Sequence, residues 1–298
     1  MVESLARLRG TIGVWSSAHE DVTPKEAGAL VAHAEASGFA AYWFPESWFR
    51  ESLTSATMLL AGTERLTVAT GITSIWGRDA VSALSAARTL NAAYDDRFVL
   101  GLGVSHSPLV ERLRSQTYTH PLERMTAFLD AMDAAKSLSP EAQHPYARVL
   151  AALGPRMLDL AATRADGAHT YLVDPTHTAG ARARLGEGFL AVEQAVALSS
   201  TREGFLERAH GHLEFYTGLE NYRANWRRLG FTDDDFVRGG SDRLCDAMVV
   251  HDVGDGEQLR QRVGEHRDAG ADHVCLQVLY APGESPVADW QRCAEALA

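Results

Sequence analysis

The chain has 298 residues, of which 46% are hydrophobic and 22% are charged. This composition is typical of a globular protein and excludes a disordered or collagen-like chain. The 28 basic and 39 acidic residues give a formal net charge of −11, so we do not expect a nucleic-acid-binding protein.

The cysteines and the apolar segments show which further classes of protein are not expected. Cys245, Cys275 and Cys293 are widely spaced, without a CxxC pair, so they predict neither a disulfide framework nor a metal site. No run of 18 apolar residues predicts a membrane span, and Met1–Val14 lacks the apolar segment of a signal peptide. We therefore expect a cytoplasmic protein without a membrane partner.

Apolar segments alternate with helical patterns from the start of the chain. Strands are predicted at Thr11–Ser17, Ala40–Glu46, Leu66–Thr73 and Arg97–Gly103, and helices at Lys25–Ser37, Thr54–Gly62 and Asp79–Ala93. These strands begin about 29, 26 and 31 residues apart, a spacing that leaves room for one crossover helix between neighbours. Parallel strands need such crossovers, so the pattern predicts a parallel sheet.

The second half continues the alternation. Strands are predicted at Ala147–Leu153, Ala168–Val173, Phe189–Leu198 and Asp272–Leu279, and helices at Pro121–Lys136, Pro155–Ala165, Pro175–Leu185 and Val287–Leu297. Eight strand–helix units favour a closed α/β barrel, a TIM barrel, over an open sheet. The chain is expected to form one domain over residues 1–298, with a helical insertion at about 200–270 before the last strand that shapes a wall of the site or an interface.

In such a barrel the functional residues gather at the carboxyl ends of the strands. The side chains that fall there include Trp15, Glu46, Ser47, His106, Glu193 and Gln277. Trp15, Trp43, Trp48 and Trp76 all fall near the ends of the first three strands, and flat aromatic walls suit a planar ligand. The alternative is that these tryptophans pack loops and helices.

The turn Leu153–Met157 (LGPRM) joins a strand to a helix. A helix amino terminus presents unpaired N–H groups and a positive dipole end, which favour a phosphate, and Arg156 could add a cationic contact. Many other helices also start at a glycine–proline turn, so the motif alone leaves both interpretations open. Gly101 and Gly103 lack the remaining features of a dinucleotide fingerprint and predict a close backbone approach instead.

His106 and Glu46 are the titratable residues best placed to handle a proton. His106 could instead be a partly exposed loop histidine, and Glu46 could form an internal ion pair with an arginine. Ser47 could hydrogen-bond a ligand or cap the next turn.

Five segments together resemble the bacterial luciferase-like superfamily of barrel oxidoreductases, and within it an actinobacterial branch that uses coenzyme F420. They are Thr11–Trp15 (TIGVW), Gly38–Ser47 (GFAAYWFPES), Leu66–Trp76 (LTVATGITSIW), Asp95–His106 (DDRFVLGLGVSH) and Val149–Val173, which begins VLAALGPRMLDL. Gly218–Phe231 is also similar to that branch, and the resemblance covers nearly the whole chain.

The resemblance implies a bulge with a non-proline cis peptide after the third strand, at Gly71–Ile72. It also implies that the cofactor phosphate lies on the Gly154 turn and its ring over the barrel mouth. The residues expected to bind the cofactor are Trp15, Gly71, Ile72, Thr73, Gly103, Ala152, Leu153, Gly154, Pro155, Arg156 and Met157. His106, Glu46 and Ser47 are the expected catalytic residues, although some relatives place an acid and a histidine where this chain has Glu46 and Ser47.

The leading hypothesis is therefore an F420-dependent oxidoreductase that transfers a hydride between the cofactor and a small organic substrate. Flavin mononucleotide (FMN) in the same cradle would instead make a monooxygenase, and a non-catalytic flavin-binding protein is a third hypothesis. The resemblance also implies a homodimer, formed through helices of the first half of the chain.

Overall fold

The computed structural model describes residues 2–46, 50–136, 139–140, 144–281 and 283–298. Within these residues ten strands form one parallel sheet, and eight of them close into a barrel in the order β10-β1-β2-β3-β5-β6-β7-β8, with β8 paired to β10. The strands are β1 (Thr11–Trp15), β2 (Ala41–Phe44), β3 (Thr67–Thr70), β4 (Thr73–Ser74), β5 (Phe98–Gly103), β6 (Ala147–Ala151), β7 (Gly167–Thr170), β8 (Phe189–Leu198), β9 (Val249–Asp252) and β10 (His273–Val278).

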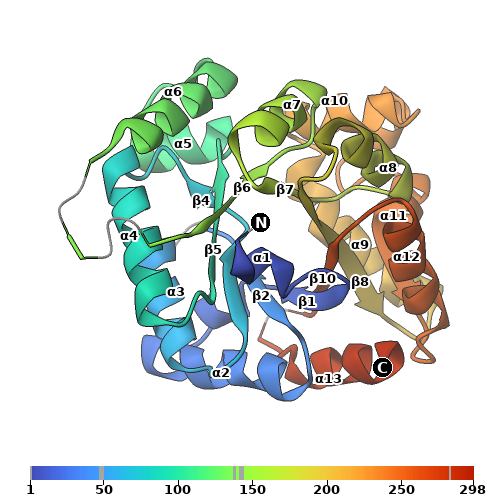
Figure 1. The fold of residues 1–298 in the computed structure, drawn as a ribbon. Coiled ribbons are helices and arrows are strands. Elements are labelled where there is room, and N and C mark those ends of the chain that lie inside the picture. Colours follow the sequence, from blue (N-terminus) through green and yellow to red (C-terminus); the bar gives the residue numbers. More distant parts are fainter. Residues whose placement is uncertain (1, 47–49, 137–138, 141–143, 282) are drawn as a thin grey trace.

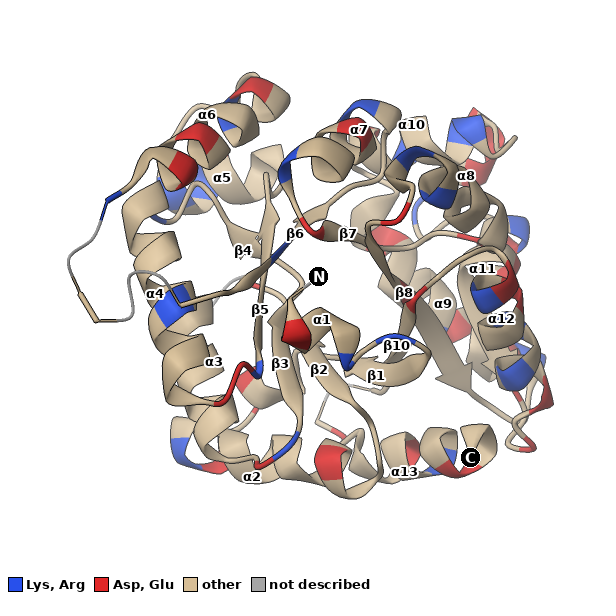
Figure 2. Cartoon of the chain, in the orientation of Figure 1, with Lys and Arg blue, Asp and Glu red and all other residues tan. Residues whose placement is uncertain are grey.

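Helices surround the barrel, and the predicted α/β barrel is confirmed (Figure 1). The helices are α1 (Glu3–Ala6), α2 (Pro24–Ala36), α3 (Ser52–Ala61), α4 (Ala80–Ala93), α5 (Ser107–Arg114), α6 (Pro121–Ala134), α7 (Pro155–Arg164), α8 (Pro175–Leu185), α9 (Arg202–Tyr216), α10 (Glu220–Arg228), α11 (Asp242–Met248), α12 (Glu257–Asp268) and α13 (Val287–Leu297). Figure 2 shows that the charged residues lie mainly on these helices and on the loops, while the strands carry few.

Local sequence signals explain where several helices begin. Thr23 and Glu26 form a capping box at α2, and Asp79 accepts a hydrogen bond from the Ser82 N–H at α4. Asp174 does the same for the His177 N–H at α8. These side chains satisfy N–H groups that have no partner within the helix, which is why the first turns could be placed from the sequence.

The amino-terminal end of the barrel is closed by α1 and by apolar side chains. Leu5 and Leu8 are buried in a cluster with residues of the barrel strands, and α1 lies over the barrel centre in Figure 1. Deeper inside, the Trp43 ring stacks on His169 with centroids 4.7 Å apart. A ligand can therefore enter the barrel only from the other end.

The third strand is interrupted, as expected. The Gly71–Ile72 peptide is cis and lies between β3 and β4. Its two flanks are held by β2, because the Gly71 N–H donates to the Phe44 carbonyl at 2.7 Å and the Glu46 N–H donates to the Ile72 carbonyl at 3.0 Å. At Gly101 a side chain is excluded, since an added Cβ would lie 1.8 Å from the Thr70 carbonyl oxygen.

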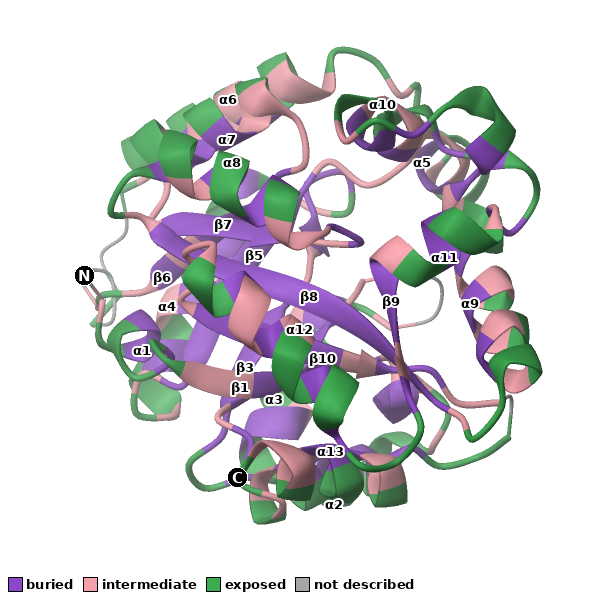
Figure 3. Cartoon of the chain, turned by 90° about the vertical axis from the view of Figure 1, so that its right-hand side faces the viewer, coloured by how far each residue is buried: buried purple, intermediate pink, exposed green. Residues whose placement is uncertain are grey.

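The segment between β8 and β10 is mostly helical, as predicted, but it contains a strand that the sequence analysis missed. β9 pairs with Ala195–Leu198, the carboxyl half of β8, and continues the sheet beyond the end of β7. Figure 3 shows α5, α9, α10 and α11 at the end of the barrel opposite α1. The insertion thus surrounds the open end of the barrel.

Among the residues that the structure describes, no helix is long and apolar enough to cross a membrane.

Candidate functional site

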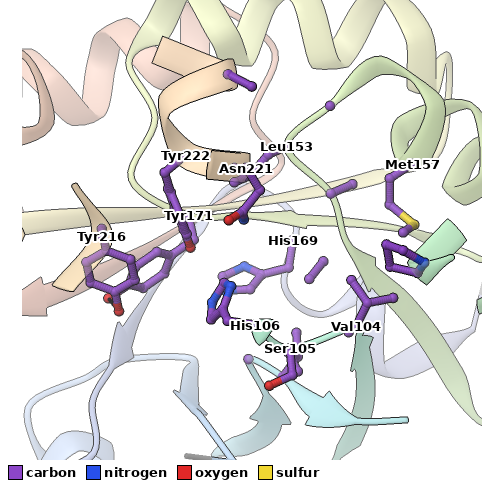
Figure 4. A pocket seen from close by; sticks show the side chains of 18 of the residues that line it. Val104, Ser105, His106, Leu153, Met157, His169, Tyr171, Tyr216, Asn221 and Tyr222 are labelled. Atoms are coloured by element: carbon purple, nitrogen blue, oxygen red, sulfur yellow. Dashed lines mark hydrogen bonds between the residues drawn. The ribbon is translucent and has the colours of Figure 1, made fainter. Parts of the chain in front are cut away.

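A cavity of about 580 Å³ occupies the open end of the barrel. Figure 4 looks into this pocket, with three tyrosines on the left, Met157 on the right and Leu153 beside Asn221 between them. The lining residues come from the strand ends, from α5 to α7 and from the insertion. Those predicted to bind a cofactor and found in the lining are Trp15, Gly71, Ile72, Gly103, Ala152, Leu153, Gly154, Pro155, Arg156 and Met157.

The floor of the pocket is built around Gly71. A Cβ added there would lie 2.7 Å from Trp15 Nε1 and 3.1 Å from His169 Nε2, so glycine keeps this space open. Both nitrogens are buried, and neither has a hydrogen-bond partner among the described residues. Buried polar atoms are normally satisfied, so these two mark a place where a polar ligand would complete the structure.

The Leu153–Gly154 turn carries positive charge into the pocket. Gly154 caps α7 without a side-chain hydrogen bond, and the helix starts at Pro155. Arg228, from the last turn of α10, reaches to 3.4 Å from the position of a Gly154 Cβ. In the described part of the chain neither Arg156 nor Arg228 has an ion-pair partner, although the protein carries a net charge of −11. Two such arginines beside a helix amino terminus are an arrangement that suits an anion.

His177 fixes the shape of this turn. Its ring is buried, and Nε2 lies 2.9 Å from the Leu153 carbonyl oxygen. A carbonyl only accepts, so Nε2 carries the proton and donates it. The sequence analysis found the turn but not Arg228, because nothing in the sequence placed α10 over it.

His106 precedes α5 and packs against two aromatic residues of the insertion. Its ring centroid lies 6.0 Å from that of Phe215 and 5.7 Å from that of Tyr222. Burial lowers the pKa of His106 to about 4, so the imidazole is neutral at pH 7. A neutral imidazole offers one N–H and one lone pair, and the ring lines the pocket. It can therefore accept a proton from a bound molecule.

Glu46 also lines the pocket, but its carboxylate is already occupied. Arg78 donates to both oxygens, at 2.9 Å and 2.5 Å, and the Ser74 N–H donates to Oε2 at 2.7 Å. The two side chains are only 5% and 8% exposed. The internal ion pair considered from the sequence is therefore present, and this pairing favours a structural role for Glu46 over proton transfer.

We expect Glu46→Gln to lower the free energy of unfolding by about 1–3 kcal/mol, because the buried Arg78 guanidinium loses one of its two charged acceptors and keeps only Glu51. Urea denaturation followed by circular dichroism measures this loss. Glu64→Gln is the control: the Glu64 side chain is 88% exposed, and its removal should change the stability by less than about 0.5 kcal/mol. Equal stabilities of the Glu46 variant and the wild-type protein would contradict the structural role.

Two of the predicted site residues have other outcomes. Thr73 is buried outside the pocket lining, with its hydroxyl 3.0 Å from that of Ser52, so the structure does not bring it together with the other predicted cofactor residues. The bulge turns the Thr73 side chain towards α3 instead. Ser47 lies outside the described residues, as does Trp48, and the role of Ser47 stays a prediction.

The predicted tryptophan wall is also wrong in part. Trp43 is buried inside the barrel on His169, and Trp76 is buried under Arg124, with its Nε1–H donated to the Val104 carbonyl. Among the described tryptophans only Trp15 lines the pocket. The aromatic surface is made instead by Tyr118, Tyr171, Phe215, Tyr216 and Tyr222.

Tyr171 is placed by an unusual backbone at Leu172, which has a positive φ of 51°. The Leu172 N–H donates to Glu193 Oε2 at 2.9 Å, and the Leu172 carbonyl accepts from Trp226 Nε1 at 3.2 Å. We call these two hydrogen bonds the Leu172 clamp. The clamp ties the end of β7 to the barrel interior on one side and to α10 on the other.

The cysteines and acidic residues build no further site. Cys245, Cys275 and Cys293 are buried free thiols, and burial raises the pKa of Cys245 and of Cys293 to about 12. In the described ranges no group of three or more His, Cys, Asp or Glu side chains is arranged to hold a metal ion.

Comparison with known proteins assigns the chain to a family. Residues 8–273 match the sequence profile of the family described as luciferase-like monooxygenase. The chain belongs to the luciferase-like monooxygenase family. The match covers every barrel strand from β1 to the start of β10, so the pocket is the open end of a luciferase-like barrel.

The chain is also similar to individual proteins whose names state different reactions. A Mycobacterium tuberculosis protein named as a coenzyme F420-dependent oxidoreductase is 24% identical over 97% of this chain and 99% of its own length. An F420-dependent secondary alcohol dehydrogenase, solved with an F420–acetone adduct, has a TM-score of 0.74 at 14% identity, over 98% and 100% of the two chains. EDTA monooxygenase from Chelativorans sp. BNC1 has a TM-score of 0.73 at 12% identity, over 97% and 93%. These two structural likenesses show the fold.

Proposed function

We propose that the protein is a coenzyme F420-dependent oxidoreductase that moves a hydride between the deazaflavin and a small organic substrate. The observation that carries the proposal is that one pocket combines two features. Its floor at Gly71 is kept open by glycine, and its turn at Gly154 lies beside two arginines without ion-pair partners among the described residues. Together these suit a flat polar ring joined to an anionic arm. The name of the curated relative, which spans the whole chain, supports the choice of F420.

The residues of the pocket fit such a cofactor. Trp15 Nε1 and His169 Nε2 would meet polar atoms of the ring, and the Arg156 N–H and the Arg156 and Arg228 side chains would hold the phosphate. When bound, the deazaflavin supplies a carbon that gives or takes a hydride.

The protein must then position the substrate and handle one proton. His106 is placed for the second task, because its neutral ring faces the pocket and Glu46 is held by Arg78. Its unprotonated ring has a lone pair for the proton that the oxidation of an alcohol releases, while the lowered pKa makes it a weaker base than an exposed histidine.

The first test is a titration of the purified protein with F420 and with FMN, followed by fluorescence and visible absorbance. We expect F420 to bind more tightly, and a panel of small alcohols and carbonyl compounds to show F420-linked turnover. Tighter binding of FMN would favour the monooxygenase of the same fold. F420 binding without turnover of any compound would favour a non-catalytic carrier. Homodimerisation stays a separate prediction, which light scattering would check.

We expect Arg228→Met to weaken F420 binding by about 10- to 100-fold, because a hydrogen bond between a guanidinium and a phosphate is lost. The same titration measures this change. Arg227→Met is a matched control on the same helix, since Arg227 is bound to Glu220 and Asp233 and should alter the affinity less than about twofold. Equal effects of the two substitutions would mean that the phosphate does not lie on this turn.

A further inference from the structure

Three polar side chains from distant parts of the chain form a hydrogen-bonded row at one wall of the pocket. Tyr216, the last residue of α9, donates its hydroxyl proton to the Tyr171 oxygen at 3.0 Å. Tyr171, which follows β7, donates to Gln277 Oε1 of β10 at 2.7 Å. Tyr171 and Tyr216 both line the pocket, and their rings lie 5.4 Å apart (Figure 4).

The row has one direction. The Gln277 oxygen carries only lone pairs, so it requires the proton of Tyr171. Tyr171 then has no proton left and accepts that of Tyr216. Each tyrosine has one proton, so the Tyr216 oxygen can offer only lone pairs to a molecule in the pocket.

Both hydroxyl groups keep their protons at neutral pH. Burial raises the pKa of Tyr216 to about 12 and raises that of Tyr171 well above its usual range. Tyr171 is also held in place by the Leu172 clamp on the next residue. The direction of the row is therefore a fixed property of the folded protein.

The row begins next to the floor of the pocket, because the ring centroids of Tyr171 and Trp15 lie 5.0 Å apart. Figure 4 shows the three tyrosines on the left of the pocket and Met157, near the start of α7, on the right. Tyr222 packs edge-on against Tyr216, with centroids 4.9 Å apart, and also contacts His106. The wall formed by Tyr171, Tyr216 and Tyr222 is thus next to the residue that handles the proton.

We propose that Tyr216 is a substrate-binding residue that accepts a hydrogen bond, so that this enzyme selects substrates that carry a second hydroxyl group, which donates to Tyr216, beside the hydroxyl whose proton His106 accepts. The inference rests on the proposed F420-dependent function and specifies the substrate class of the same pocket. A carbonyl or ether oxygen at this position would face the lone pairs of Tyr216 and gain no hydrogen bond. A hydrogen bond of this kind corresponds to about a 3- to 10-fold difference in affinity.

Two isomeric probes isolate this contact. 1-Methylcyclohexanol and cyclohexyl methyl ether are isomers, but only the alcohol donates a hydrogen bond. Because it is a tertiary alcohol, its carbinol carbon has no hydrogen to transfer, so it binds without being oxidised. Ligand-observed NMR titrations of the protein loaded with oxidised F420 give both dissociation constants. We expect the wild-type protein to prefer the alcohol by about 3- to 10-fold and Tyr216→Phe to bind both probes equally.

Tyr171→Phe tests whether the preference comes from the direction of the hydrogen bonds or only from the packing of the tyrosine rings. Without Tyr171 the Tyr216 proton is released, so the variant should gain affinity for the ether while keeping its affinity for the alcohol. Tyr94→Phe is the control, because Tyr94 lies outside the pocket lining and should not alter the preference. An unchanged preference in Tyr216→Phe, or no gain for the ether in Tyr171→Phe, would overturn the inference.

Titration of each variant with F420 separates the two levels of the argument. A wild-type protein that does not bind F420 would refute the proposed function, and the substrate inference with it. Normal F420 binding together with a probe preference that ignores Tyr216 would refute only the role of Tyr216.

Discussion

Replacement of His106 by glutamine is expected to lower kcat for F420-linked oxidation of an alcohol by about 10²- to 10⁴-fold, the usual contribution of a positioned acid–base group. Glutamine keeps a polar side chain of similar reach beside Phe215 and Tyr222 but cannot accept a proton. The affinity for F420 should stay within about twofold, because the ring floor and the phosphate turn are untouched. Stopped-flow absorbance with any alcohol that the wild-type protein oxidises measures the rate.

The pH profile is a sharper test of the same residue. Burial depresses the pKa of His106 to about 4, so its basic form is present at every pH above that value. For oxidation, kcat/KM should therefore rise through about pH 4 and be level at neutral pH, whereas an ordinary histidine would give a limb near pH 6.5. The limb should be absent in the glutamine variant. His33→Gln, on the exposed face of α2, serves as the control and should behave as the wild-type protein. A full rate in His106→Gln would exclude this role.

Glu193→Gln is expected to change how stability depends on pH. Glu193 is fully buried on β8, and burial raises its pKa to about 8. Between its unfolded value of 4.5 and about 8, the folded protein holds a proton that the unfolded chain has released. This group therefore lowers the stability of the wild-type protein as the pH rises through that range. The penalty is absent below pH 4.5 and complete above about pH 8.

The size of this effect follows from the shift. Relative to Glu193→Gln, the wild-type protein should lose about 3–4 kcal/mol of unfolding free energy between pH 5 and pH 9. Glutamine retains an oxygen for the Leu172 N–H, so the clamp is kept. Urea denaturation at a series of pH values gives the difference, and Glu123→Gln, at an exposed position, should show no such slope. A constant difference between the two proteins would mean that Glu193 is ionised in the folded state.

The barrel could be predicted because its signals are local. Strands at the spacing of one crossover helix, and caps such as Thr23, Asp79 and Asp174, are visible in short stretches of sequence. β9 was missed although it is as long as β2, β3 and β7, because it exists by pairing with the far half of β8. No local pattern reveals a partner that is more than 50 residues away.

The pocket was predicted in part for a similar reason. Its floor and the Gly154 turn lie at strand ends, where barrel geometry directs attention. Tyr171 was assigned to the interior of a strand predicted to run to Val173, but β7 ends at Thr170 and frees it. Tyr216 and Arg228 belong to the insertion, and their place over the barrel mouth depends on long-range packing. The spacing of Asn221, Ala224 and Arg228 puts them on one face of α10, but nothing in the sequence shows that this face covers the pocket.

The Leu172 clamp has a consequence for how such proteins diversify. Glu193 of β8 binds the N–H of Leu172 and Trp226 of α10 binds its carbonyl, so the segment from α9 to α11 is tied to the barrel through the backbone of one residue. If that segment were exchanged for the corresponding piece of a relative, the wall formed by Tyr171, Tyr216 and Tyr222 would be preserved only where the new piece also donates an indole N–H to the Leu172 carbonyl. Chimeras without this indole should still fold as barrels but misplace Tyr171. One backbone carbonyl, that of Leu172, would thus decide whether such an exchange keeps the pocket intact.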